Sequence, residues 1–157
     1  MKALVVYFSR SGTTRKVAEK ISADLVADME EITEKGRRSG IIGFLKSGME
    51  AYLERLVSID PTNHDPSQYD LVVIGTPVWS NKMSSPVRSY IAKNKDKLMH
   101  KSVAFFATLG GEDASKALRG LEDYTGMVPL SSVGIRAVEV GNGTFVRKVE
   151  DFMAKLK

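Results

Sequence analysis

The 157-residue chain contains no cysteine, which excludes disulfide bonds, thiolate nucleophiles and zinc or iron–sulfur sites held by cysteine. Only two histidines are present, His64 and His100, and both lie in polar stretches where we expect them to be solvated. We therefore assign no metal site and no catalytic side chain. Any redox chemistry must come from a bound organic cofactor.

Long hydrophobic runs are also missing. The longest uninterrupted apolar run, Ala3 to Phe8, is far below the roughly 18 residues that span a bilayer and is too short for the core of a signal peptide. We therefore expect no membrane span and a cytoplasmic protein. The length predicts a single domain over residues 1–157, and the net charge of +4 makes acidic partners plausible.

Five segments of the sequence have the composition of β-strands. The apolar residues of 3–8, 71–74 and 103–107 run without alternation, as in strands buried on both faces of a parallel sheet. The segments 29–32 and 133–140 are interrupted by charged residues or glycine, which indicates edge strands.

Helical spacing of apolar residues follows each predicted strand. The five predicted helices cover the segments 17–25, 41–56, 85–98, 114–121 and 145–156. The second has Leu45, Met49, Leu53 and Leu56 on one face, and Ser85 is the expected cap of the third. This alternation predicts an α/β fold, a three-layer doubly wound parallel sheet of five strands in the order 2-1-3-4-5.

In such a sheet, ligands bind beyond the carboxyl ends of the strands where the strand order reverses. The loop after the first strand is rich in hydroxyls and leads directly into a helix; it reads Ser9, Arg10, Ser11, Gly12, Thr13 and Thr14. Backbone N–H groups and the helix dipole favour a phosphate there. The alternative is that the hydroxyls only cap the helix. The triphosphate loop and the dinucleotide glycine fingerprint are both missing.

The other two loops at this edge suit a flat ligand. The loop after the third strand contains Thr76, Pro77, Val78, Trp79 and Asn81, with the only tryptophan of the chain. We expect a planar ligand to stack on Trp79, although a lone tryptophan is often a core residue. The fourth strand ends in Thr108, Leu109, Gly110 and Gly111, where paired glycines let the backbone approach a ring closely. The alternative is a plain turn in which Asp113 caps the next helix.

These three loops resemble those of the flavodoxin-like FMN-binding family, and the resemblance covers essentially the whole chain. The loop 9–14 is similar to the family pattern Ser/Thr, any residue, Thr/Ser, Gly, Asn, Thr, except that Thr13 stands where Asn is usual. The resemblance implies FMN as the cofactor, with its phosphate in the loop 9–14 and its ring against residues 76–79 and 108–111. The chain resembles the short form of the family.

Two departures from the family pattern bear on function. No aromatic residue occurs between Phe106 and Tyr124, so one face of the flavin is expected to be open, as in NAD(P)H-dependent reductases of the family. The chain is also net positive, whereas flavodoxins are typically acidic. The resemblance implies an electron carrier between redox partners or, alternatively, an NAD(P)H-dependent FMN oxidoreductase acting on a quinone or another small acceptor.

A basic cluster of Lys35, Arg37 and Arg38 precedes the second predicted helix, which contains Gly43 and Gly48. We interpret the cluster as a solvated connection; a flap beside the crevice is the alternative. No aromatic residues alternate with these cations, so we expect no nucleic-acid binding. The role of residues 35–57 and the oligomeric state stay open.

Overall fold

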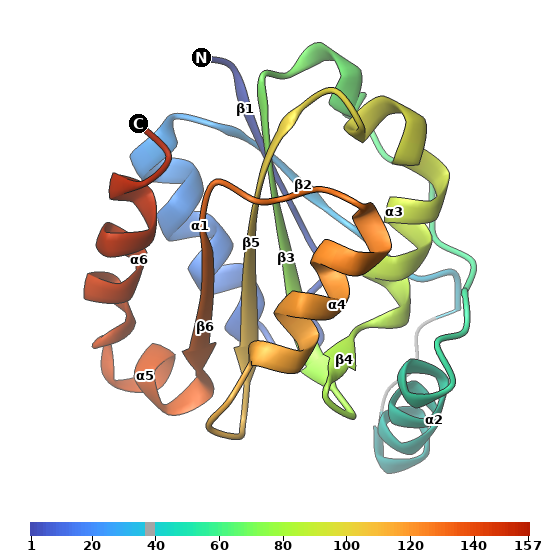
Figure 1. The fold of residues 1–157 in the computed structure, drawn as a ribbon. Coiled ribbons are helices and arrows are strands. Elements are labelled where there is room, and N and C mark those ends of the chain that lie inside the picture. Colours follow the sequence, from blue (N-terminus) through green and yellow to red (C-terminus); the bar gives the residue numbers. More distant parts are fainter. Residues whose placement is uncertain (37–39) are drawn as a thin grey trace.

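The computed structural model describes residues 1–36 and 40–157 of the chain. Arg37 and Arg38 of the predicted basic cluster lie outside the described residues. A central parallel sheet is covered by helices on both faces (Figure 1). The strands are β1 (Ala3–Tyr7), β2 (Asp28–Glu31), β3 (Leu71–Trp79), β4 (Lys82–Met83), β5 (Ser102–Leu109) and β6 (Ser132–Arg136).

The helices are α1 (Thr13–Leu25), α2 (Gly40–Tyr52), α3 (Ser85–Leu98), α4 (Ser115–Thr125), α5 (Ala137–Asn142) and α6 (Phe145–Ala154), with a short 3-10 turn at Pro66–Gln68. Each predicted helix is present, but the second ends at Tyr52 instead of residue 56, and an additional short helix, α5, precedes the last one. The sheet order is β2-β1-β3-β5-β6, and these five strands pair in parallel. Counted among themselves they give the predicted order 2-1-3-4-5, so the predicted fold class is confirmed.

The strand β4 is an addition to the predicted sheet. It pairs antiparallel with the end of β3, with Val78 opposite Met83 and Trp79 opposite Lys82. Ser80 and Asn81 form the two-residue turn with φ of 51° and 61°. Two positive φ values match the twist of tight hairpins. Residues 76–79, which the sequence placed in a loop, therefore belong to β3, because their backbone has a partner strand.

The core consists of two apolar layers, one on each face of the sheet. One layer joins β1, β3 and β5 to α1 and α6 through residues such as Val17 and Phe152. The other lies under α3 and α4 and contains Tyr90, Phe105 and Leu121. The central strands contribute side chains to both layers, which explains their uninterrupted apolar sequence.

Two predictions from the sequence need correction, the end of the last strand and the environment of His64. The last strand stops at Arg136, not at Val140, because a capping box between Arg136 and Glu139 starts α5 there. His64 is not simply solvated: its Nδ1 lies 2.7 Å from Oε2 of Glu30, a buried carboxylate on the edge strand β2. His100 is exposed, as expected.

The helix caps differ from the prediction in one detail. Ser84, not Ser85, is the N-cap of α3, with Pro86 in the first turn as predicted. Gly126 ends α4 in the left-handed conformation. In the described part of the chain, no helix has the length and apolar character needed to cross a membrane.

Candidate functional site

The loop between β1 and α1 is built around the hydroxyl of Ser9. Its Oγ accepts hydrogen bonds from the backbone N–H groups of Gly12 (3.1 Å) and Arg15 (3.2 Å). Gly12 precedes α1 with φ of 95°, a conformation that glycine adopts at little cost. Ser9 and Gly12 therefore shape the loop, and the first turn of α1 follows at the carboxyl edge of the sheet.

Two backbone donors in this turn are available to a ligand. The N–H groups of Thr13 and Thr14 belong to the first turn of α1, where a helix offers no acceptor of its own. The hydroxyls of Ser11 and Thr13 lie 3.3 Å apart at the same place. Donors of this kind at the positive end of a helix suit a phosphate group.

Thr14 contributes differently from the other hydroxyls. Its side chain is buried, at 2% exposure, and its Oγ1 lies 2.7 Å from Oγ1 of Thr108 on β5. This bond joins the first loop to the end of β5. The two predicted site residues are thus together, but their hydroxyls face each other inside the molecule.

Trp79 lies half-buried at the end of β3, next to the first loop. Its ring makes an edge contact with Phe8 at 5.5 Å, and the guanidinium of Arg10 lies 5.8 Å from its centroid. Arg10 also donates a 2.6 Å hydrogen bond to Ser47 on α2. The first loop, the β3 hairpin and α2 are therefore connected at this edge.

The remaining predicted residues of the β3 hairpin divide into buried and exposed groups. Thr76 is fully buried, and its hydroxyl bonds to the Pro77 carbonyl and to Ser84. Pro77 and Val78 are partly buried, and Asn81 is exposed at the turn. Of the predicted residues of this hairpin, Asn81 is therefore exposed and Trp79 is partly accessible, whereas Thr76 is closed to a ligand.

The third loop is open at its glycine pair. Leu109 is buried at the end of β5, whereas Gly110 and Gly111 are exposed and have no atom close to the position of an added Cβ. Asp113 accepts a 2.8 Å hydrogen bond from the backbone N–H of Ser115, the first residue of α4, but the N-cap position expected for Asp113 in the alternative interpretation belongs to Ala114. The hydroxyl of Ser115 also donates a hydrogen bond to this carboxylate, and the hydroxyl first and the backbone N–H second hold the pKa of Asp113 below its usual range.

The helix α2 borders this edge, a position that the sequence analysis gave only as the alternative of a flap beside the crevice. Besides the bond of Ser47 to Arg10, the Gly48 carbonyl accepts a 3.0 Å hydrogen bond from Ser80. Figure 1 shows α2 beside the β4 hairpin, apart from the rest of the helical layer. The sequence signal for this position, a basic cluster followed by a helix with two glycines, is weak.

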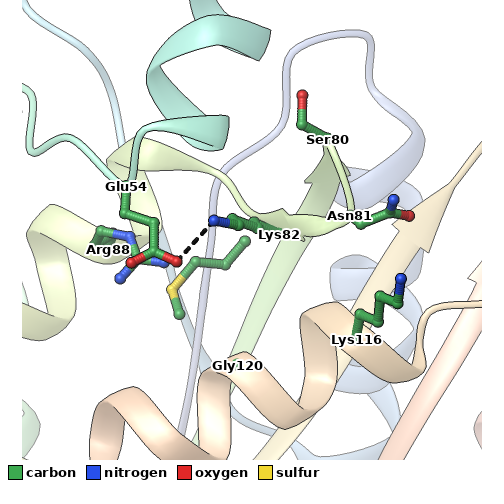
Figure 2. A pocket seen from close by; sticks show the side chains of 8 residues that line it. Glu54, Ser80, Asn81, Lys82, Arg88, Lys116 and Gly120 are labelled. Atoms are coloured by element: carbon green, nitrogen blue, oxygen red, sulfur yellow. Dashed lines mark hydrogen bonds and ion pairs between the residues drawn. The ribbon is translucent and has the colours of Figure 1, made fainter.

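A feature that the sequence analysis missed is a pocket between the end of α2, the β4 hairpin, α3 and α4 (Figure 2). It encloses about 320 Å³ and contains three cationic side chains, those of Lys82, Arg88 and Lys116. Nothing in the spacing of these residues along the sequence pointed to a common site. Across the described residues, no group of three histidine, aspartate or glutamate side chains could hold a metal ion.

Comparison with known families identifies the class of protein. The sequence model of the family described as "Flavodoxin domain" matches residues 32–142, more than half of the chain, so this protein belongs to the flavodoxin domain family. The matched stretch includes the β3 hairpin and the third loop; the loop 9–14 lies outside it. No curated protein matches the chain.

Solved structures agree with this assignment. A flavoprotein from Lactobacillus acidophilus, determined in complex with FMN, is 25% identical with a TM-score of 0.73, over 90% of this chain and 97% of that one. The two-electron reduced flavodoxin of Megasphaera elsdenii is 16% identical with a TM-score of 0.59, over 86% of this chain and 85% of that one. The Trp repressor binding protein of Bacillus subtilis is 15% identical with a TM-score of 0.64, over 97% and 98%. The last two are similarities of fold.

Proposed function

We propose that this protein binds FMN at the carboxyl edge of its sheet and transfers electrons between redox partners in the cytoplasm. The observation that carries the proposal is the meeting of three features at one edge: the first turn of α1, the ring of Trp79 and the open glycine pair after β5. The family assignment and the FMN complex of the Lactobacillus flavoprotein support FMN as the cofactor.

Each loop has a distinct role in this proposal. The N–H groups of Thr13 and Thr14, with the hydroxyls of Ser11 and Thr13, hold the phosphate. Trp79 covers part of the ring system, and the backbone at Gly110 and Gly111 approaches its other side. FMN supplies the capacity to take up and release one or two electrons, and the protein sets access and potential through these contacts.

A second candidate function is an NAD(P)H-dependent reductase that passes electrons to a quinone or another small acceptor. The exposed glycine pair favours it, because neither Gly110 nor Gly111 carries a side chain that could close this side of the site. A flat donor or acceptor has room to approach there. The carrier and the reductase therefore differ in what reaches this opening, a protein surface or a small molecule.

Thr13→Glu tests the phosphate site. A carboxylate at the first position of α1 favours the helix through its dipole, so the fold is kept, but it faces the phosphate of FMN. At a separation of about 4 Å, this repulsion predicts a loss of FMN affinity of roughly 100-fold or more. The measurement is a titration of the cofactor-free protein with FMN, followed through the fluorescence of Trp79, the only tryptophan. Thr13→Val, which lacks only the hydroxyl, is the matched control and should lose far less. Equal affinity of Thr13→Glu and the wild type would contradict the site.

The reductase is separated from the carrier by adding NADPH to the FMN-loaded protein without oxygen. Rapid loss of the oxidised flavin absorbance would establish the reductase. A flavin that stays oxidised with NADPH but is reduced by a flavodoxin reductase would establish the carrier. If the purified protein retains no flavin after reconstitution, the proposed function fails.

A further inference from the structure

The pocket beside the β4 hairpin is distinct from the edge where we place FMN. It is bounded by the end of α2, by the hairpin turn Ser80–Asn81, by α3 and by α4 (Figure 2). Its volume of about 320 Å³ lies in the range of small-molecule sites. None of the residues to which the proposed function gives a role lines it, although Asn81, which the sequence predicted as a cofactor contact, does.

Arg88 is the unusual residue of this pocket. Its side chain is buried, with 7% exposure for the residue, yet its Nε has no hydrogen-bond partner among the residues that the structure describes. The guanidinium lies 4.6 Å from the ring centroid of Tyr124, whose ring stabilises the cation but gives Nε no oxygen or nitrogen acceptor. A buried cation with an unused donor is costly, and such groups in folded proteins usually have a partner. Because Arg88 lines the pocket, an anion bound there would face this guanidinium and offset its charge.

The charge of the pocket indicates what that ligand is. Three cations, Lys82, Arg88 and Lys116, face one carboxylate, Glu54, which leaves an excess of positive charge. Glu54 is already bound to Lys82 at 2.8 Å, and the pKa of its carboxyl is lowered by Lys82 and, to a smaller extent, by Arg88. In Figure 2, Lys116 extends from α4 toward Asn81, on the opposite side of the pocket from Arg88.

We propose that this pocket is a binding site for an anionic oxygen group, a phosphate or a carboxylate carried by a small molecule. The planar guanidinium of Arg88 suits both groups, since its N–H donors match pairs of oxygens. Lys116 adds charge from the opposite wall, and the hydroxyl and amide of Ser80 and Asn81 border the same space.

Gly120 gives the site its free volume. It lines the pocket from the middle of α4, and a Cβ added there would meet no atom within 4 Å. Glycine inside a helix costs about 1 kcal/mol relative to alanine. Gly120→Leu therefore fills the pocket without removing a charge and without weakening the helix, which makes it a steric test of the site.

The experiment uses FMN-loaded, 15N-labelled protein, so that the loop 9–14 is occupied by the cofactor's phosphate. The Nε–H signal of Arg88 is followed during titration with inorganic phosphate and, separately, with succinate, at constant ionic strength set with chloride.

In the wild type we expect a saturable shift of the Arg88 signal. We expect roughly fivefold weaker binding in Lys116→Gln, because one of the three cations is removed. Binding should be lost in Gly120→Leu. Lys93→Gln, on an exposed part of α3 with the same change in net charge, should bind like the wild type.

Two results would overturn the proposal: a shift of Arg88 that does not saturate with either anion, or a saturable shift that persists in Gly120→Leu. The anion that binds more tightly identifies the ligand as a phosphate or a carboxylate compound. Failure of FMN binding would refute the proposed function and leave this test intact, because the Arg88 signal can be followed in the cofactor-free protein.

Discussion

At the scale of single residues, two buried tyrosines show how a hydroxyl can stabilise or destabilise the same fold. The hydroxyl of Tyr69 donates a 2.7 Å hydrogen bond to the carboxylate of Asp28. The hydroxyl of Tyr90 is buried and finds no hydrogen-bond partner within residues 1–36 and 40–157. Both rings are almost completely buried, so replacement by phenylalanine changes the hydroxyl and little else.

We expect opposite effects from these two replacements. Tyr69→Phe should lower the free energy of unfolding by about 1–2 kcal/mol, because a bond to a charged acceptor is lost. Tyr90→Phe should leave the free energy of unfolding unchanged or raise it by up to about 1 kcal/mol, because an unpaired buried hydroxyl is removed. Urea denaturation at pH 7 measures both. A larger loss in Tyr90→Phe than in Tyr69→Phe would contradict this assignment.

The same tyrosines predict a loss of stability in alkali. Burial, and then the hydrogen bond to Asp28, raise the pKa of Tyr69 to about 12, and burial also raises the pKa of Tyr90. A raised pKa means that the fold favours the protonated phenol, so the stabilisation is complete below about pH 10 and decreases above it. Urea denaturation between pH 9 and pH 11 should show this decrease, and it should be smaller in Tyr69→Phe. Equal slopes in wild type and variant would show that Tyr69 does not contribute.

At the scale of secondary-structure elements, the contact between β3 and β5 depends on a glycine. Gly75 is opposite Phe106 in the parallel register, and a Cβ added at Gly75 would overlap the ring of Phe106. Gly75→Ala should therefore destabilise the protein by about 1–3 kcal/mol. Combined with Phe106→Leu, it should cost less than the sum of the two single changes, because the smaller side chain leaves room for the methyl group.

Gly110→Ala is the control for this prediction. Gly110 follows β5, is exposed and has open space where a Cβ would lie, so the same substitution should change stability by less than about 0.5 kcal/mol. Denaturation of the cofactor-free proteins measures all four variants. Strict additivity of Gly75→Ala and Phe106→Leu would show that the strands adjust by a backbone shift instead.

Elements with a clear local sequence pattern could be predicted, whereas elements that form through contacts with other parts of the chain could not. The central strands followed from their continuous apolar sequence, and the edge position of β2 followed from its charges. The hairpin of β4 was missed, because Pro77 inside a strand and a Ser80–Asn81 turn give no strong local signal. The apolar face of α2 was foreseen, but Leu45, Met49, Leu53 and Leu56 are exposed, and the buried side includes Ser47 and Ala51.

For the candidate site as well, the sequence predicted what depends on strand order but not what depends on side-chain packing. The carboxyl edge and its three loops could be located from the strand order, since the topology alone places them together. The inward hydroxyl pair of Thr14 and Thr108 could not be foreseen, because it depends on how closely α1 approaches β5. The pocket around Arg88 joins residues from α2, the hairpin, α3 and α4, and only the packing of these elements brings them together.

At the scale of the whole molecule, the net charge of the polypeptide is +4 and falls to about +2 when the FMN phosphate is bound, and this charge predicts which redox partners react fastest. A positively charged surface attracts anions over a distance set by ionic strength, about 30 Å at 0.01 M salt and less than 10 Å at 0.3 M. Oxidation of the reduced, FMN-loaded protein by ferricyanide should therefore slow by about three- to tenfold between these two salt concentrations. Stopped-flow measurement of the flavin absorbance gives the rate.

Two acceptors of different charge isolate this electrostatic effect. A neutral benzoquinone should react at a rate that is nearly independent of salt, and a cationic cobalt(III) hexammine should react faster as salt increases, because repulsion is screened. If ferricyanide and the cation respond to salt in the same direction, the net charge does not govern access to the flavin. If their order is reversed, the field at the site is negative despite the overall charge, and a basic protein becomes the expected partner in place of an acidic one.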